Sequence, residues 1–338
     1  MVDVSLLRAP VKSLMWATVA ALGLVLAALL GTLALAMVSA WRHPLPPQGA
    51  LAQPLGTDAR TAHPIVLAHG MMGFDRIGQV SYWPGIVEAL QARGAAVHVT
   101  RVAAFQSSEV RGEQLLAQVT TIAASSPTGK VNLLGHSQGG HAARYVAARR
   151  PDLVASVTAV ATPVAGSEFA DWMDEQVRRG TWAASAILAM GEGVGQLVNW
   201  ASGADFPQDV RAALASLNSQ GAAEFNRRFP AAVPPEPCGQ GETEVQGVRY
   251  FSWSGVGTFH HPLNLPDYLM SLTGQAFVRE QGDGLVGRCA SHLGEVIDDR
   301  VPLNHFQIVN QMPGLHADGV DPVALYLAHA RRLRGLGL

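Results

Sequence analysis

A ten-residue segment at 131–140, Val-Asn-Leu-Leu-Gly-His-Ser-Gln-Gly-Gly, constrains the fold of this chain more than any other feature. It has the pattern of a buried strand that enters a Gly-x-Ser-x-Gly turn and leaves as a helix, which Pro151 ends. The turn is so tight that Gly135 and Gly139, which flank Ser137, must lack side chains. We therefore expect Ser137 at the tip of a strand-to-helix turn, as a candidate nucleophile.

The rest of the chain has the pattern of an α/β fold. From residue 64 onward, short apolar runs alternate with longer amphipathic ones, which is typical of a mostly parallel sheet flanked by helices. With 338 residues, 48% of them hydrophobic, the chain can bury a full core in one large domain. We expect strands at 65–68, 96–99, 131–134, 154–160 and 248–253, and helices at 83–93, 109–124, 139–149 and 321–333.

The N-terminal 40 residues have the pattern of an export segment. Arg8 and Lys12 precede 25 uncharged residues at 14–38, which as a helix would span roughly 37 Å, more than the roughly 30 Å of a bilayer core. Small residues at 38–40 fit a cleavage site, so both a cleaved signal peptide and a retained membrane anchor stay open. We expect 1–40 to be that segment, 41–63 a proline-rich linker and 64–338 the α/β domain, secreted or periplasmic, or held at the inner membrane.

Charge and cysteine content narrow the partners and the compartment. A formal net charge of −2 leaves no basic field that would collect nucleic acid, so we expect no nucleic-acid partner. The only two cysteines, Cys238 and Cys289, lie in no metal-binding pattern, and an exported protein tends to pair an even number of them. Such a disulfide would stabilise the fold by roughly 4 kcal/mol.

A serine hydroxyl needs a histidine to take its proton and an acid to orient the imidazole. In a fold with this turn, the acid and then the histidine follow the serine along the chain. Asp283, between two glycines, is the best placed acid, although Asp267, Asp298 and Asp299 stay open. The histidines far enough downstream are His292, His305, His316 and His329, of which we favour His305.

Two backbone N–H groups are also needed for the oxyanion of the tetrahedral intermediate. One is expected from Gln138, directly after Ser137 at the start of the helix. The other is expected from Met71, in the run His-Gly-Met-Met-Gly (69–73) that follows the first strand. A third feature is the apolar stretch at 181–204, which is either a buried core helix or a mobile lid over the site.

Taken together, these segments closely resemble the secreted bacterial true lipases of the Pseudomonas and Burkholderia type, members of the α/β-hydrolase superfamily. The resemblance implies the α/β-hydrolase fold with a helical lid at about 181–204, the triad Ser137, Asp283 and His305, and oxyanion donors Met71 and Gln138. It also implies that Arg111 braces the oxyanion loop and that Cys238 pairs with Cys289. The matching segments are 64–75, 107–118, 130–140, 144–148, 150–157, 250–255, 283–294 and 304–311.

One departure from these lipases concerns calcium. Such lipases usually bind a calcium ion through two aspartates near the catalytic histidine, and the corresponding positions here hold Asn264 and Gln307. Calcium favours carboxylate oxygens, so replacing both with amides should weaken the site severely. We expect no tightly bound calcium and no other cofactor, unless Asp267 substitutes through a shifted loop.

The resemblance implies hydrolysis of acylglycerol esters through an acyl-enzyme on Ser137, with a lipid or other ester at an interface as substrate. A carboxylesterase or polyester depolymerase would use the same residues. A membrane-anchored, non-catalytic binding protein is a more distant alternative, because the serine, acid and histidine are all present. The resemblance also suggests a lipase-specific foldase as a partner during secretion.

Overall fold

The computed structural model describes residues 56–338 and has, within that range, a central sheet of seven strands. The strand order is β4-β1-β5-β6-β8-β7, and β9 also pairs directly with β8, farther along that strand than β7 does. Every pair is parallel except β7–β8, so the predicted mostly parallel sheet is confirmed. The strands are β1 (Ile65–Ala68), β4 (Val97–Val99), β5 (Val131–His136), β6 (Val154–Val160), β7 (Glu244–Val245), β8 (Val248–Gly255) and β9 (Glu295–Val301); β2 (Arg76–Ile77) and β3 (Val80–Ser81) form a separate small hairpin.

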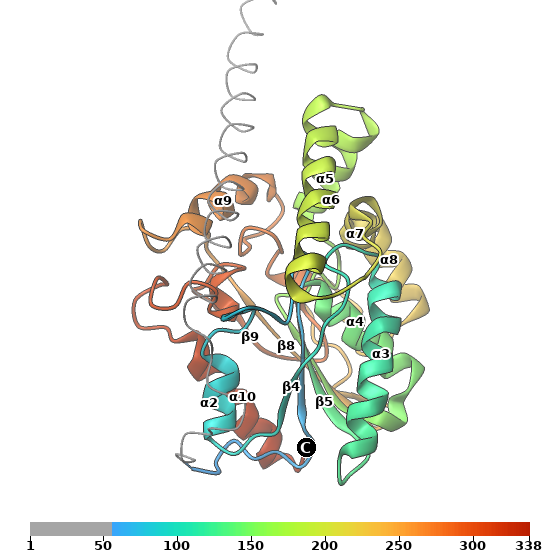
Figure 1. Cartoon of the computed structure of the whole chain (residues 1–338), viewed down its shortest axis with the longest axis vertical. Helices are drawn as coiled ribbons and strands as arrows, with labels where there is room; N and C mark the ends of the chain where they lie inside the picture. The colour runs from blue at the N-terminus through green and yellow to red at the C-terminus, as the bar shows by residue number, and fades with distance from the viewer. Residues whose placement is uncertain (1–55) are drawn as a thin grey trace, which may run out of the picture.

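Helices cover both faces of this sheet (Figure 1). Helices α3 and α4 pack together over one face, and α2 and α10 pack together over the other. Because both faces are covered, β5 and β6 are buried along their whole length. The helices are α2 (Ile86–Ala92), α3 (Ser108–Ser125), α4 (Gln138–Arg149), α5 (Glu168–Arg178), α6 (Trp182–Ser202), α7 (Val210–Leu217), α8 (Ser219–Arg228), α9 (Leu265–Thr273) and α10 (Pro322–Gly335), with short 3₁₀ turns η2 (Pro151–Leu153), η3 (Gly274–Ala276), η4 (Cys289–Ser291) and η5 (Gln307–Val309).

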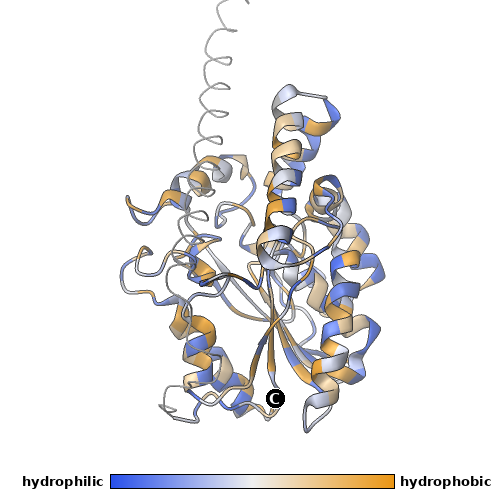
Figure 2. Ribbon diagram, viewed as in Figure 1, coloured by the Kyte–Doolittle hydropathy of each residue, from blue (hydrophilic) through white to orange (hydrophobic). Residues whose placement is uncertain are grey.

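The two apolar cores follow from strand geometry. Successive side chains of a strand point to opposite faces, so Ile65 and Leu67 of β1 enter the core under α2 and α10. Val66 and Ala68 enter the core under α3 and α4. Hydrophobic residues accordingly follow the central strands, whereas α3 carries both hydrophobic and hydrophilic residues along its length (Figure 2).

The sequence patterns located most elements of the sheet layer and missed several others. All five predicted strands and all four predicted helices are present, with ends shifted by a few residues. The missed strands and α-helices are the short strands β2, β3 and β7, strand β9, and helices α5, α7, α8 and α9. Strand β9 has the sequence Glu-Val-Ile-Asp-Asp-Arg-Val and lies at the edge of the sheet, so most of its residues are only partly buried and no apolar run marks it.

The apolar stretch predicted at 181–204 forms the single helix α6. With α5 it makes a hairpin that projects from the body of the molecule, beyond the ends of the sheet strands (Figure 1). Leu188 and Val198 are buried, whereas Trp182 and Trp200 are 47% and 73% exposed. Helix α6 therefore has apolar side chains on both its inner and its outer surface.

Within residues 56–338, no helix is long and apolar enough to cross a membrane. The predicted signal peptide or anchor at 1–40 and most of the predicted linker at 41–63 lie outside the described residues. The first strand of the sheet begins at Ile65, close to the predicted start of the α/β domain at 64.

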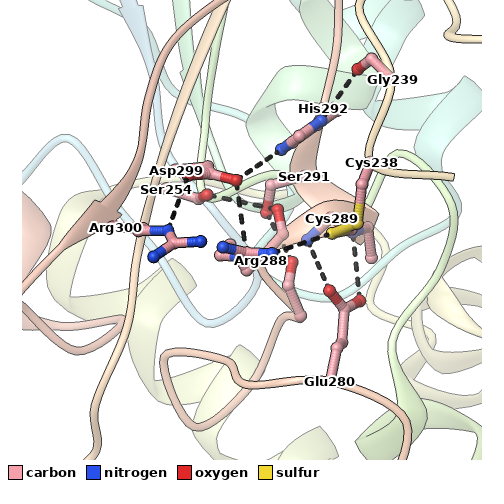
Figure 3. Close-up of a disulfide and its surroundings, with 12 residues drawn as sticks. Cys238, Gly239, Ser254, Glu280, Arg288, Cys289, Ser291, His292, Asp299 and Arg300 are labelled. Carbon is pink, nitrogen blue, oxygen red and sulfur yellow. Dashed lines mark hydrogen bonds and ion pairs between the residues drawn. A yellow bond between two sulfur atoms is a disulfide. The ribbon is translucent and has the colours of Figure 1, made fainter.

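Cys238 and Cys289 form the expected disulfide (Figure 3). It joins the loop after α8 to the start of η4. The carboxylate of Glu280 accepts hydrogen bonds from the N–H groups of Cys289 (2.5 Å) and Ala290 (3.2 Å). The His292 ring lies between the carbonyl oxygen of Gly239 (2.9 Å) and a carboxylate oxygen of Asp299 (3.2 Å). The disulfide therefore sits among polar contacts that fix both of the chain segments that it joins.

Replacing both cysteines with serine should lower the free energy of unfolding by about 4 kcal/mol, because the unfolded chain regains the freedom of a long loop. The two cysteines are 51 positions apart in the sequence. Urea unfolding of the Cys238→Ser/Cys289→Ser variant measures the change, and the reduced wild-type protein is the control that should match it. An unfolding midpoint equal to that of the oxidised protein would contradict this expectation.

Candidate active site

Ser137 occupies the expected turn between β5 and α4. Its backbone is in a strained conformation, with φ 54° and ψ −128°. A side chain on Gly135 would overlap the backbone of Gly139, and one on Gly139 would overlap the carbonyl group of Ala68. Both glycines are therefore required by close backbone contacts, as the sequence pattern predicted. The N–H of Ser137 donates to the carbonyl oxygen of Val160 (2.8 Å), which ties the turn to the neighbouring strand β6.

Asp283 and His305 lie together at this end of the sheet. Nδ1 of His305 is 2.8 Å from Oδ2 of Asp283, and both side chains are almost fully buried. The other carboxylate oxygen accepts hydrogen bonds from the N–H groups of Leu285 (3.0 Å) and Val286 (2.8 Å). Because the carboxylate holds Nδ1–H, Nε2 of His305 is left as the basic nitrogen. The His305 ring lies against that of His136, the residue before Ser137, with 4.6 Å between the ring centroids and the ring planes tilted by 44°.

The other candidate acids and histidines do not form such a pair with each other near Ser137. His292 hydrogen bonds to Gly239 and Asp299 beside the disulfide (Figure 3). His329 is buried on α10 against Thr158, and His316 contacts the carbonyl of the next residue. The alternative acids make other contacts: Asp298 accepts from the N–H of Arg300, Asp299 contacts His292 and two arginines, and Asp267 bonds to four N–H donors near α9.

Met71 and Gln138 lie on the two backbone segments that meet at Ser137. A side chain on Gly70, the residue before Met71, would come within 2.8 Å of Cβ of Ser137. Gln138 is the first residue of α4, where N–H groups have no partner within the helix. Among the described residues, neither N–H is paired with a protein acceptor. Two backbone donors are thus available beside the serine.

Arg111, on α3, is fully buried beneath the loop that carries Met71. Its Nη2 donates to the carbonyl oxygens of His69 (2.5 Å) and Gly70 (3.0 Å). Its Nη1 donates to the side-chain oxygen of Gln138 (2.6 Å). Burial lowers the pKa of Arg111 to about 9, so it stays charged at neutral pH. One guanidinium therefore contacts both of the segments that carry the predicted oxyanion donors.

Sequence reasoning missed three contributors to this site. It assigned Gln138 only a backbone N–H role, although its side-chain amide hydrogen bonds to Arg111 and to the carbonyl of Gln106 (2.8 Å). It also did not single out Tyr82 or His136, whose side chains hydrogen bond to each other (2.7 Å). His136 is the first of the two variable residues of the Gly-x-Ser-x-Gly motif, and no motif marks Tyr82, so only the folded arrangement connects them.

Helix α6 covers the loop that carries Met71. A third apolar cluster contains Leu188 and Val198 of α6, with Met71, Met72 and Phe74 packed against it. Ser137 and His305 are only 8% and 3% exposed. The stretch that the sequence left open between core helix and lid is therefore a helix packed directly over the loop beside the serine.

Asn264 and Gln307 lie in a hydrogen-bonded cluster close to His305. Nε2 of Gln307 faces three oxygens, namely Oδ1 and Oδ2 of Asp267 (3.0 and 3.3 Å) and the carbonyl of Leu315 (3.2 Å). Nδ2 of Asn304 donates to the same carboxylate (2.6 Å), and Nδ2 of Asn264 donates to Leu315 (2.7 Å). These residues do not fit calcium, because amide N–H groups already take up the oxygens that a cation would need. Within residues 56–338, no group of three or more acidic, histidine or cysteine side chains could hold a metal.

The profile of the alpha/beta hydrolase fold family matches residues 63–303. Triacylglycerol lipases from Vibrio cholerae, Pseudomonas fragi and Burkholderia plantarii are 44%, 40% and 38% identical to this chain. The three matches cover 82%, 82% and 83% of this chain, and 90%, 98% and 88% of the respective lipases. The solved structure of a Staphylococcus hyicus lipase has a TM-score of 0.58 at 15% identity, covering 85% of this chain and 99% of that one. The α/β-hydrolase fold expected from the sequence is thereby confirmed.

Acid should destabilise the protein through its buried histidines. Burial lowers the pKa values of His69, His141 and His329 from 6.5 to about 3. Between about pH 6.5 and pH 3 the unfolded chain therefore binds more protons than the folded one, so stability is present above this window and is lost as the pH falls. Each of these histidines should lower the free energy of unfolding by about 1.4 kcal/mol for each pH unit below about pH 6.

Urea unfolding at pH 7, 6 and 5 tests this expectation. The matched control is His329→Gln, which cannot titrate and should reduce the pH dependence by about one proton. His329 lies on α10, in the core under the sheet rather than beside Ser137. A free energy of unfolding that stays constant from pH 7 to pH 5 would show that these histidines are not neutral in the folded protein.

Proposed function

Since the chain belongs to the α/β-hydrolase fold family, and within it to the bacterial triacylglycerol lipases of the Pseudomonas and Burkholderia type, we propose that it hydrolyses acylglycerol esters through an acyl-enzyme on Ser137. The observation that carries this proposal is the buried His305–Asp283 pair next to the strained serine turn. The pair supplies a base and an orienting acid, and the turn supplies the nucleophile next to them.

In the proposed mechanism, Nε2 of His305 takes the proton of Ser137 Oγ as that oxygen attacks the ester carbonyl. The N–H groups of Met71 and Gln138 stabilise the oxyanion of the tetrahedral intermediate. His305 then protonates the departing alcohol oxygen, which leaves an acyl group on Ser137. Water, deprotonated by His305, attacks this acyl group, and the serine leaves with the proton returned. Asp283 holds the imidazole and stabilises its charged form.

Helix α6 favours an acylglycerol lipase over an esterase for small soluble substrates. Its inner side chains pack on the oxyanion loop, and its exposed tryptophans, Trp182 and Trp200, suit contact with a lipid surface. We propose that α6 is a lid that moves at such a surface. A carboxylesterase or polyester depolymerase is the second candidate, with the same chemistry on another ester.

Export and a foldase are further parts of the proposal. The apolar N-terminal segment at 14–38 supports placement outside the cytoplasm. A lipase-specific foldase as a folding partner is proposed from the resemblance to the Pseudomonas and Burkholderia lipases alone.

Ser137→Ala should abolish hydrolysis of emulsified triacylglycerol and of soluble p-nitrophenyl butyrate, lowering kcat by about 10⁵-fold or more. A fluorophosphonate probe should label the wild-type protein and leave this variant unlabelled. Ser125→Ala, at an exposed position at the end of α3, is the matched control and should behave as wild type. An unlabelled wild-type protein would favour a binding protein, and activity on the soluble ester alone would favour an esterase.

We propose that this lipase needs no calcium, because the amide of Gln307 takes the cation's place between Asp267 and Leu315. EDTA should then change neither its melting temperature nor its activity. The double variant Asn264→Asp/Gln307→Asp, which crowds three carboxylates together, should lose stability in EDTA and regain it in millimolar calcium. A wild-type melting temperature that falls by several degrees in EDTA, and recovers with calcium, would refute the proposal.

A further inference from the structure

We infer that Tyr82 is a positioning residue for the oxyanion hole: its hydroxyl group links the loop that carries Met71 to the turn that carries Ser137. This inference rests on the proposed function, since it concerns how the oxyanion donors are oriented. Tyr82 follows β3 and is 4% exposed. It is not among the residues that the sequence pattern or the resemblance brought forward.

The first step concerns the peptide group between His69 and Gly70. In a trans peptide the C=O and N–H bonds point in opposite directions. Here the carbonyl oxygen of His69 accepts from Arg111 (2.5 Å), and the N–H of Gly70 donates to the hydroxyl oxygen of Tyr82 (3.1 Å). The peptide plane is therefore held at both ends, by Arg111 on one side and by Tyr82 on the other.

The second step concerns the next peptide group, which contains the N–H of Met71. Its carbonyl oxygen, on Gly70, accepts from the same guanidinium of Arg111 (3.0 Å), so the N–H of Met71 points the opposite way. Residue 70 has to be glycine, because a side chain there would come within 2.8 Å of Cβ of Ser137. A glycine has little conformational preference of its own. The direction of the Met71 N–H therefore depends on the hydrogen bonds that hold Gly70, and Tyr82 provides the one to its N–H.

The third step connects Tyr82 to the nucleophile turn. The hydroxyl oxygen accepts from Gly70, so the hydroxyl proton goes to the remaining partner, Nδ1 of His136, at 2.7 Å. His136 then carries its own proton on Nε2, the nitrogen left without a partner among the described residues. Burial lowers the pKa of His136 well below its ordinary value, so this ring stays neutral beside His305. A neutral neighbour allows His305 to take up the serine proton without repulsion.

The ring and the hydroxyl of Tyr82 can be separated experimentally. The ring packs edge-on against Trp83 (5.2 Å between ring centroids) and Phe74 (6.1 Å), which explains an aromatic residue at this position but not the hydroxyl. Tyr82→Phe keeps the ring and removes only the two hydrogen bonds. The structure thus provides a substitution that tests positioning with little change in packing.

The experiment compares full-length wild type and Tyr82→Phe on soluble p-nitrophenyl butyrate, with active sites counted by fluorophosphonate labelling. Oxyanion contacts act only in the transition state, so kcat per labelled site should fall by about 10- to 100-fold while KM stays within about twofold. The inhibition constant of butylboronic acid, which forms a tetrahedral adduct with an activated serine, should rise by a similar factor. A purely structural role would reduce the number of labelled sites and leave both of these quantities unchanged.

Tyr145→Phe is the matched control, because its hydroxyl bonds to Glu113 two helical turns beyond Ser137. It should retain wild-type kcat per site and boronate affinity. Wild-type values of both quantities in Tyr82→Phe, or an effect on KM alone, would overturn the inference. If the wild-type protein itself is not labelled, the proposed function fails instead, and the two failures are thereby told apart.

Discussion

The close crossing between the end of β1 and the start of α4 is the contact on which the rest of the site depends. Gly139 lies so near the carbonyl group of Ala68 that no side chain fits between them. Because of this contact, Ser137 and the loop after β1 meet at the same edge of the sheet, with Gly70 against the serine. The strained backbone of Ser137 is sustained by the parallel strands on either side, β1 and β6, which hold β5 in place.

A single buried charge organises the side of the site that carries Met71 and Gln138. Among residues 56–338 no carboxylate pairs with Arg111, and its guanidinium instead donates hydrogen bonds to two backbone carbonyl oxygens and one side-chain amide oxygen. The surrounding histidines, His69 and His141, are neutral because burial lowers the pKa of each to about 3. The site therefore keeps one fixed positive group near the place where negative charge would develop, and its dipoles are oriented before any substrate binds.

The histidine side of the site is organised by hydrogen bonds between neutral amides and one carboxylate. Asp267 accepts from the backbone N–H groups of His260 and His261 and from the side chains of Asn304 and Gln307. Asn304 and Gln307 flank His305, so this cluster anchors the loop that presents the imidazole. The disulfide at Cys289 restrains the chain shortly after Asp283. Asp283 and His305 therefore both lie on chain segments that are held in place close to the pair.

The sequence by itself determined the layered fold and the nucleophile turn, because apolar periodicity and a Gly-x-Ser-x-Gly segment depend on neighbours along the chain. Local pattern did not determine β9, whose charged residues lie at a sheet edge, or the choice among four acids and four histidines. Resemblance favoured Asp283 and His305, and the fold brought these two together. Only the tertiary structure connected Tyr82, His136 and the side chain of Gln138 to Arg111 and Gly70, because their contacts join segments far apart in the sequence that no local pattern relates.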